Sequence, residues 1–139
     1  MFRRIDALAT ALTAAVIAAS AWAADASLLA QGTSQWQAGL LDEAQKSFQQ
    51  AVLADPNSIE ARMRLGGLQL VNRDYAAAIL TYQQAIRLDA DNAKAWMGLG
   101  FAYLHSGQRE LSRAAFAEAI RVEPGRKAQL APLASGLAE

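Results

Sequence analysis

The sequence lacks cysteine and is poor in histidine, proline and aromatic residues. Without cysteine it can form no disulfide, no thiolate metal site and no cysteine nucleophile. The single histidine, His105, excludes a zinc site of several histidines, and we expect it at an exposed helix end without an acid–base partner. An aromatic content of 7% and only three prolines favour packed helices over a β-sandwich.

The sequence also has no excess of charge of either sign, because 13 basic side chains balance 13 acidic ones. A nucleic-acid-binding protein usually carries a basic excess or stripe, so we expect no nucleic-acid partner. The acidic run Asp89-Ala90-Asp91-Asn92 resembles the start of a calcium loop only superficially. Lys94 and Gly100 stand where such a loop needs glycine and glutamate, so we interpret the run as a turn with Asn92 capping the next helix. We therefore expect no enzymatic activity, no metal and no cofactor.

The first 23 residues have the layout of a secretory signal peptide. Phe2-Arg3-Arg4 is a short basic start, the stretch from Ala7 to Ala19 is almost wholly apolar, and Ala21-Trp22-Ala23 is a small-x-small cleavage site. This pattern predicts cleavage after Ala23 and a periplasmic or secreted protein that meets the membrane only transiently. The alternative is an uncleaved N-terminal helix that anchors a self-associating structural protein, although the apolar run is shorter than the roughly 20 residues a spanning helix needs.

The rest of the chain repeats itself every 34 residues. Sliding the sequence against itself by this interval aligns three glycines, three alanines and three aromatic residues. The aligned sets are Gly32, Gly66 and Gly100; Ala51, Ala85 and Ala119; and Phe48, Tyr82 and Phe116. Three units without insertions follow, 25–58, 59–92 and 93–126, so that one repeat domain occupies residues 24–126.

The third unit carries the best-kept motif. Its marker residues are Trp96, Leu99, Gly100, Tyr103, Ser112, Phe116, Ala119 and Pro124. This order resembles the tetratricopeptide repeat pattern, W-x2-L-G-x2-Y followed by a small residue, an aromatic, an alanine and a proline. The units depart from it at Leu28, Gln31, Gln35, Arg62, Gln69, Ala90 and Ser112. The resemblance implies an all-α fold, a right-handed α-solenoid of three helix-turn-helix units with a short C-terminal cap helix.

Local signals place the helix ends. Gly39 and Gly107 are expected between paired helices, because glycine readily takes the left-handed conformation past a helix end. Ser58 is an expected N-cap, and a helix is expected from about Glu110 to Val122. In the tail, 127–139, apolar spacing predicts a helix of about two turns from about Ala131, with Pro132 in its first turn.

The resemblance also implies where a partner would bind. In tetratricopeptide repeats the first helix of each unit lines a concave groove through fixed positions, with nearby charges on its rim. The candidate residues are Leu29, Thr33, Trp36, Met63, Arg64, Leu70, Lys94, Met97, Phe101 and Leu104. Most are apolar, which favours a protein partner that presents an apolar segment or amphipathic helix. A clamp for a C-terminal carboxylate, as chaperone-tail-binding repeats possess, is not expected, because only Lys94 matches its cationic and amide positions.

Overall fold

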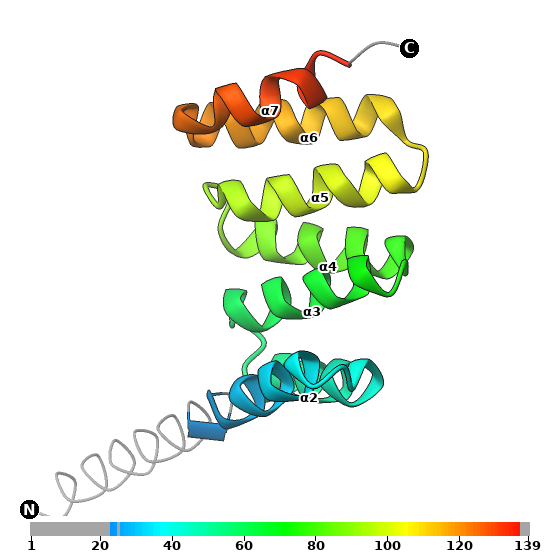
Figure 1. Cartoon of the computed structure of the whole chain (residues 1–139). Helices are drawn as coiled ribbons and strands as arrows, with labels where there is room; N and C mark the ends of the chain where they lie inside the picture. Colours follow the sequence, from blue (N-terminus) through cyan, green and yellow to red (C-terminus); the bar gives the residue numbers. More distant parts are fainter. Residues whose placement is uncertain (1–22, 25, 137–139) are drawn as a thin grey trace, which may run out of the picture. The chain divides into compact units, whose positions relative to one another are not determined.

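The computed structural model describes residues 23–24 and 26–136, and this part of the chain is helical and contains no strand (Figure 1). The chain divides after Pro56 into two compact units. The first unit holds a helix over residues 26–37 and α2 (Leu41–Ala54). The second unit holds α3 (Ile59–Val71), α4 (Tyr75–Leu88), α5 (Ala93–His105), α6 (Arg109–Val122), the 3-10 helix η1 (Pro124–Arg126) and α7 (Lys127–Ala134). The predicted signal peptide lies almost entirely outside the described residues.

The turn inside each helix pair has the same hydrogen-bond pattern. Gly39 and Gly107 have φ values of 78° and 81°, as expected for residues that end a helix in the left-handed conformation. Around Gly107, the N–H of Gln108 donates to the carbonyl of Tyr103 at 2.8 Å, and the N–H of Gly107 donates to that of Leu104 at 3.1 Å. These two bonds form a Schellman motif, which closes the helix and starts the next one.

Side-chain caps begin the helices that open the second and third repeats. Ser58 accepts a hydrogen bond from the Ala61 N–H at 3.2 Å, and Asn92 accepts one from the Ala95 N–H at 3.0 Å. Both predicted N-caps are confirmed. The residues from Asp89 to Asn92 therefore form a turn between helices.

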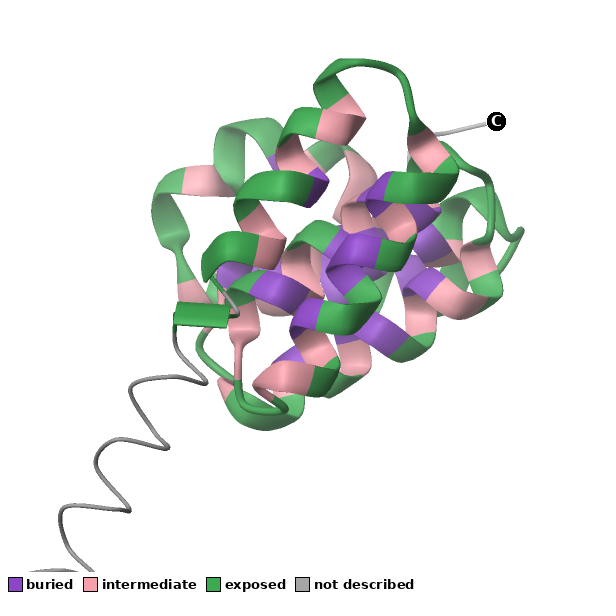
Figure 2. Ribbon diagram, turned by 90° about the horizontal axis from the view of Figure 1, so that it is seen from below, coloured by how far each residue is buried: buried purple, intermediate pink, exposed green. Residues whose placement is uncertain are grey.

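The aligned glycines let the two helices of a pair approach each other closely. Each glycine faces the aligned aromatic ring of its own 34-residue repeat: Gly32 faces Phe48, Gly66 faces Tyr82 and Gly100 faces Phe116. A Cβ atom at Gly66 would lie 2.9 Å from Cζ of Tyr82, and one at Gly100 would lie 2.7 Å from Cε1 of Phe116. This close approach is the packing reason why the three aligned positions carry glycine. Buried residues lie on the sides of the helices that face one another (Figure 2).

The cap helix differs from its prediction. It begins at Lys127 rather than near Ala131, directly after η1, so Pro132 lies inside the helix and beyond its first turn. The fully buried side chain of Leu130 decides this register, because it packs against Phe116 and Ala119 of α6. The missing N–H of Pro132 removes one backbone hydrogen bond, a cost that this contact offsets.

Candidate functional site

The three candidate residues of the first unit share one face of the helix over residues 26–37. Leu29, Thr33 and Trp36 are each half-buried. The Thr33 hydroxyl donates to the Leu29 carbonyl at 2.8 Å, within the helix itself. Trp36 packs edge-on against Phe48 with ring centroids 6.2 Å apart, so this indole also supports the core of its own unit.

In the second compact unit, Met63 and Arg64 of the second repeat lie close to Lys94 of the third repeat. With Ile59, Glu60 and Asn92 they line a hollow of about 520 Å³ between the N-terminal ends of α3 and α5, named here the α3–α5 hollow. Glu60 and Arg64 form an exposed ion pair at 3.2 Å, and Lys94 is exposed. The hollow therefore combines an apolar wall with positive charge at its edge.

Met97 and Phe101 lie in a different environment. Both pack against the buried cluster of Phe116, Ala119 and Leu130, with the ring centroids of Phe101 and Phe116 5.0 Å apart. Because Leu130 belongs to α7, the cap helix draws these two side chains into its own packing. They remain half-buried and leave only part of their surface for a partner.

Leu70 and Leu104 lie toward the C-terminal ends of their helices. Leu70 packs against the core of the second unit, whereas Leu104 is exposed. His105 follows it at the end of α5 and is exposed, as predicted. Its ring stacks on Tyr75 of α4 with centroids 5.5 Å apart, so its contact is with an aromatic ring rather than with an acid. Within the described residues, no group of three or more histidine, aspartate or glutamate side chains is arranged to hold a metal ion.

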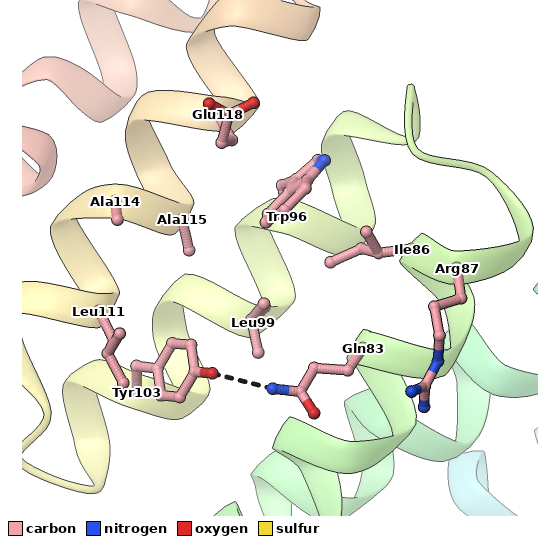
Figure 3. Close-up of a pocket in the computed structure, with 10 residues that line it drawn as sticks. All are labelled: Gln83, Ile86, Arg87, Trp96, Leu99, Tyr103, Leu111, Ala114, Ala115 and Glu118. Atoms are coloured by element: carbon pink, nitrogen blue, oxygen red, sulfur yellow. Dashed lines mark hydrogen bonds between the residues drawn. The ribbon is translucent and has the colours of Figure 1, made fainter.

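A larger apolar cleft was not predicted from the sequence. It encloses about 710 Å³ between α4 and α6, over one side of α5, and is named here the α4–α6 cleft (Figure 3). Its lining residues are Gln83, Ile86, Arg87, Trp96, Leu99, Tyr103, Leu111, Ala114, Ala115 and Glu118. The one sequence signal for it is Leu111, the only large apolar side chain among the α6 residues of this lining, which otherwise are alanine and glutamate.

Helix pairs repeated in this way define an all-α helical-repeat protein. Two family models, both described as tetratricopeptide repeat, match residues 29–93 and 72–136. The chain therefore belongs to the tetratricopeptide repeat family, whose members are protein-interaction modules. No curated protein matches the sequence. Along residues 23–24 and 26–136, no helix is both long and apolar enough to cross a membrane.

Solved structures show the same fold. MamA is 31% identical with a TM-score of 0.69, over 73% of this chain and 59% of MamA. PcrH in complex with the chaperone binding region of PopD is 25% identical with a TM-score of 0.68, over 78% of this chain and 81% of PcrH. The second tetratricopeptide domain of human RPAP3, in complex with an HSP70 peptide, is 23% identical with a TM-score of 0.77, over 83% of this chain and 95% of that domain.

Proposed function

We propose that this protein is a non-enzymatic scaffold that binds an apolar segment or amphipathic helix of another protein in the α3–α5 hollow. The observation that carries the proposal is the meeting of Met63, Arg64 and Lys94 around one hollow of about 520 Å³. Methionine adapts its flexible, polarisable side chain to varied apolar partners. The similarity to PcrH, solved with a segment of its partner PopD, supports a protein ligand.

The charges of the hollow define the partner further. Glu60 already pairs with Arg64, whereas Lys94 makes no ion pair with any residue in the described part of the chain. A positive charge at the edge of an apolar hollow favours a ligand with an acidic side chain next to its apolar residues. The proposed ligand is therefore an apolar segment flanked by aspartate or glutamate.

The proposed place of action is the periplasm or the outside of the cell. This part of the proposal rests on the sequence pattern of residues 1–23, with its basic start, apolar run and small-x-small site. An exported scaffold without catalytic groups suits a role in assembling a complex of the cell envelope.

Site-specific photocrosslinking tests the α3–α5 hollow. A photoreactive benzoylphenylalanine in place of Glu60, an exposed residue of the hollow, is expected to crosslink a defined partner in envelope extract, and the same group at the exposed Gln84 of α4 is not. Mass spectrometry of the product identifies the partner segment, which should be apolar and acidic.

A charge reversal supplies the second measurement. Lys94→Glu is expected to reduce capture of that partner at least several-fold, because the exposed side chain contributes to binding and little to folding. Gln84→Glu is the matched control. Equal capture by wild type and Lys94→Glu, with unchanged helical circular dichroism, would contradict the proposal.

A further inference from the structure

The α4–α6 cleft is formed by two helices that both pack on α5. Among the described elements, α4 and α6 make no contact with each other, so one side of α5 lies open between them. The resulting surface cleft has a volume of about 710 Å³, which lies in the size range of binding sites.

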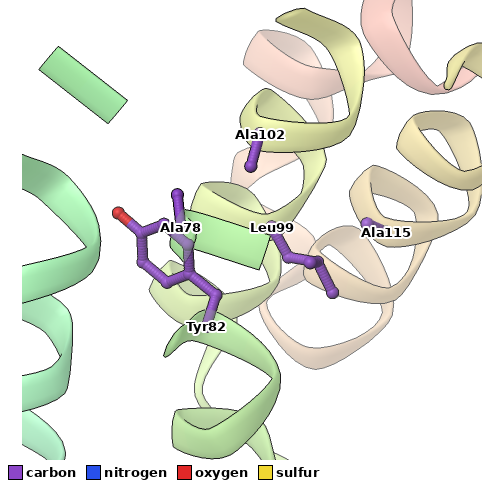
Figure 4. Packing of buried hydrophobic residues seen from close by; sticks show 5 residues of the cluster. All are labelled: Ala78, Tyr82, Leu99, Ala102 and Ala115. Atoms are coloured by element: carbon purple, nitrogen blue, oxygen red, sulfur yellow. The ribbon is translucent and has the colours of Figure 1, made fainter. Parts of the chain in front are cut away.

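The lining of this cleft is apolar. Leu99 and Ala115 form its floor and belong to the buried core cluster of the second unit (Figure 4). Ile86 and Trp96 flank the floor and are half-buried, whereas Leu111 on the α6 side is 47% exposed. A partner that covered these side chains would remove a contiguous apolar surface from water, which is the main favourable term in association.

The polar groups of the cleft are already partly engaged. Gln83 donates a hydrogen bond from Nε2 to the Tyr103 hydroxyl at 3.0 Å, which fixes both side chains across the α4–α5 boundary (Figure 3). Glu118 accepts one from Arg121 at 2.7 Å. Arg87, at the same end of the cleft as Glu118 and Trp96, makes no ion pair with the residues that the structure describes. The free charge of the cleft is therefore positive.

From these features we infer that the α4–α6 cleft is a second docking site, which takes one amphipathic helix of a partner protein with an acidic residue beside its apolar face. A helix is favoured because the walls are helices whose backbone groups are already hydrogen-bonded. An extended peptide would find no backbone partners on these walls, whereas a helix satisfies its own N–H and C=O groups internally. The acidic residue pairs with Arg87.

A displayed peptide library tests this site and does not require that the natural partner be identified first. The probe is a phage library of 16-residue helix-forming peptides with one randomised face, selected on the full chain. Enriched peptides are expected to combine apolar residues at i, i+3, i+4 and i+7 with aspartate or glutamate at the flank. Failure to enrich any peptide above background would overturn the proposal.

Two pairs of variants assign the binding site of the enriched peptides. Ala114→Trp, which fills the cleft, is expected to weaken binding at least tenfold, whereas Ala117→Trp, on an exposed position of α6 outside the cleft, is not. Arg87→Glu is expected to change the selected flank from acidic to basic, whereas Lys94→Glu leaves it acidic. Binding that survives Ala114→Trp, or an acidic preference that survives Arg87→Glu, would overturn the inference.

The same variants separate this site from the α3–α5 hollow and from self-association. Peptides that lose binding only in Lys94→Glu would occupy the hollow and leave the cleft without a ligand. Analytical ultracentrifugation tests whether a second copy of the chain, rather than a partner helix, occupies the cleft. Concentration-dependent dimers that Ala114→Trp abolishes would show that the cleft serves self-association and would contradict a separate partner helix.

Discussion

Arg73 stands at the turn of the second helix pair, where the other two pairs have glycine. It has a φ of 61°, and the same two backbone bonds close the turn, from Arg73 N–H to the Leu70 carbonyl and from Asp74 N–H to the Gln69 carbonyl. Residues with a Cβ atom adopt this conformation at a cost of about 1–2 kcal/mol. The 34-residue interval from Gly39 and Gly107 falls on this position, but arginine itself gives no signal for a left-handed turn.

Arg73→Gly is therefore expected to stabilise the protein. Relief of the backbone strain exceeds the extra entropy that glycine gives to the unfolded chain, for a net gain of roughly 0.5–1 kcal/mol in the free energy of unfolding. Urea denaturation monitored by circular dichroism measures it. Gly107→Arg, the reverse change at the aligned position, should lower stability, and unchanged stability in both variants would show that the left-handed turn carries no strain.

The burial of Tyr82 makes the stability of the protein depend on pH. Burial raises the pKa of its hydroxyl from 10.0 to about 12. Between these values the unfolded chain has lost the phenolic proton and the folded protein retains it, so rising pH favours unfolding. The protonated hydroxyl therefore contributes about 2–3 kcal/mol to the free energy of unfolding below pH 10, and this contribution is lost as the pH passes 12.

The test compares wild type with Tyr82→Phe, which keeps the ring against Gly66. Denaturation from pH 9 to 12 should show a steeper loss of stability in the wild type, because only that protein has the buried hydroxyl. Parallel curves would mean that the hydroxyl ionises equally easily in both states.

Several departures from the repeat pattern are explained by hydrogen bonds between paired helices, which the spacing of residues in the sequence does not show. Gln69 accepts a hydrogen bond from Thr81 at 2.8 Å, and Gln35 accepts one from Ser47 at 2.6 Å, at the aligned positions of the first unit. Ser112 donates to the Gly100 carbonyl at 2.9 Å, which satisfies a buried hydroxyl where alanine is usual. Each partner lies on the other helix of the pair, so the sequence shows the departures but not the bonds.

At the scale of helices, positions that depend on local chemistry were predicted well. The caps at Ser58 and Asn92 and the helix that begins at Arg109 follow from neighbouring residues. The start of α7 was predicted wrongly, because the position of Pro132 was weighed above the burial of Leu130, a contact with another helix. Local rules locate a helix end only where tertiary packing does not override them.

Leu130→Ala is expected to loosen α7. Removing a fully buried leucine costs about 2–5 kcal/mol, more than an eight-residue helix with an internal proline can lose and stay docked. Limited trypsin digestion should then cleave faster after Arg126 and Lys127. Gln129→Ala, on the exposed side of the same helix, is the control, and equal cleavage of both variants would show that another contact holds the cap.

At the scale of the whole chain, the interval of 34 residues predicted the all-α repeat class, which the structure and the family match confirm. The site could be predicted only in part. Met63, Arg64 and Lys94 meet in one hollow, while Met97 and Phe101 also serve the packing of the cap. The α4–α6 cleft arises from the distance between two helices that do not touch, and residue spacing within a helix carries no information about that distance.

Processing of the N-terminus decides whether the scaffold is free or tethered. Expressed in full in a bacterium, the chain is expected to appear in the periplasmic fraction with Ala24 as its first residue, because signal peptidase needs small residues at positions 21 and 23. Intact-mass measurement of the purified protein gives the first residue directly.

Two substitutions sharpen this test. Ala23→Leu should abolish cleavage after position 23, so that Ala24 is no longer the first residue, whereas Trp22→Ala, between the two small residues, should be processed normally. If the wild type instead keeps residues 1–23 and sediments with membranes, the N-terminal helix is an anchor, as in the alternative hypothesis. The α3–α5 hollow and the α4–α6 cleft would then act at the membrane surface, where a fixed tether raises the effective concentration of any neighbouring partner.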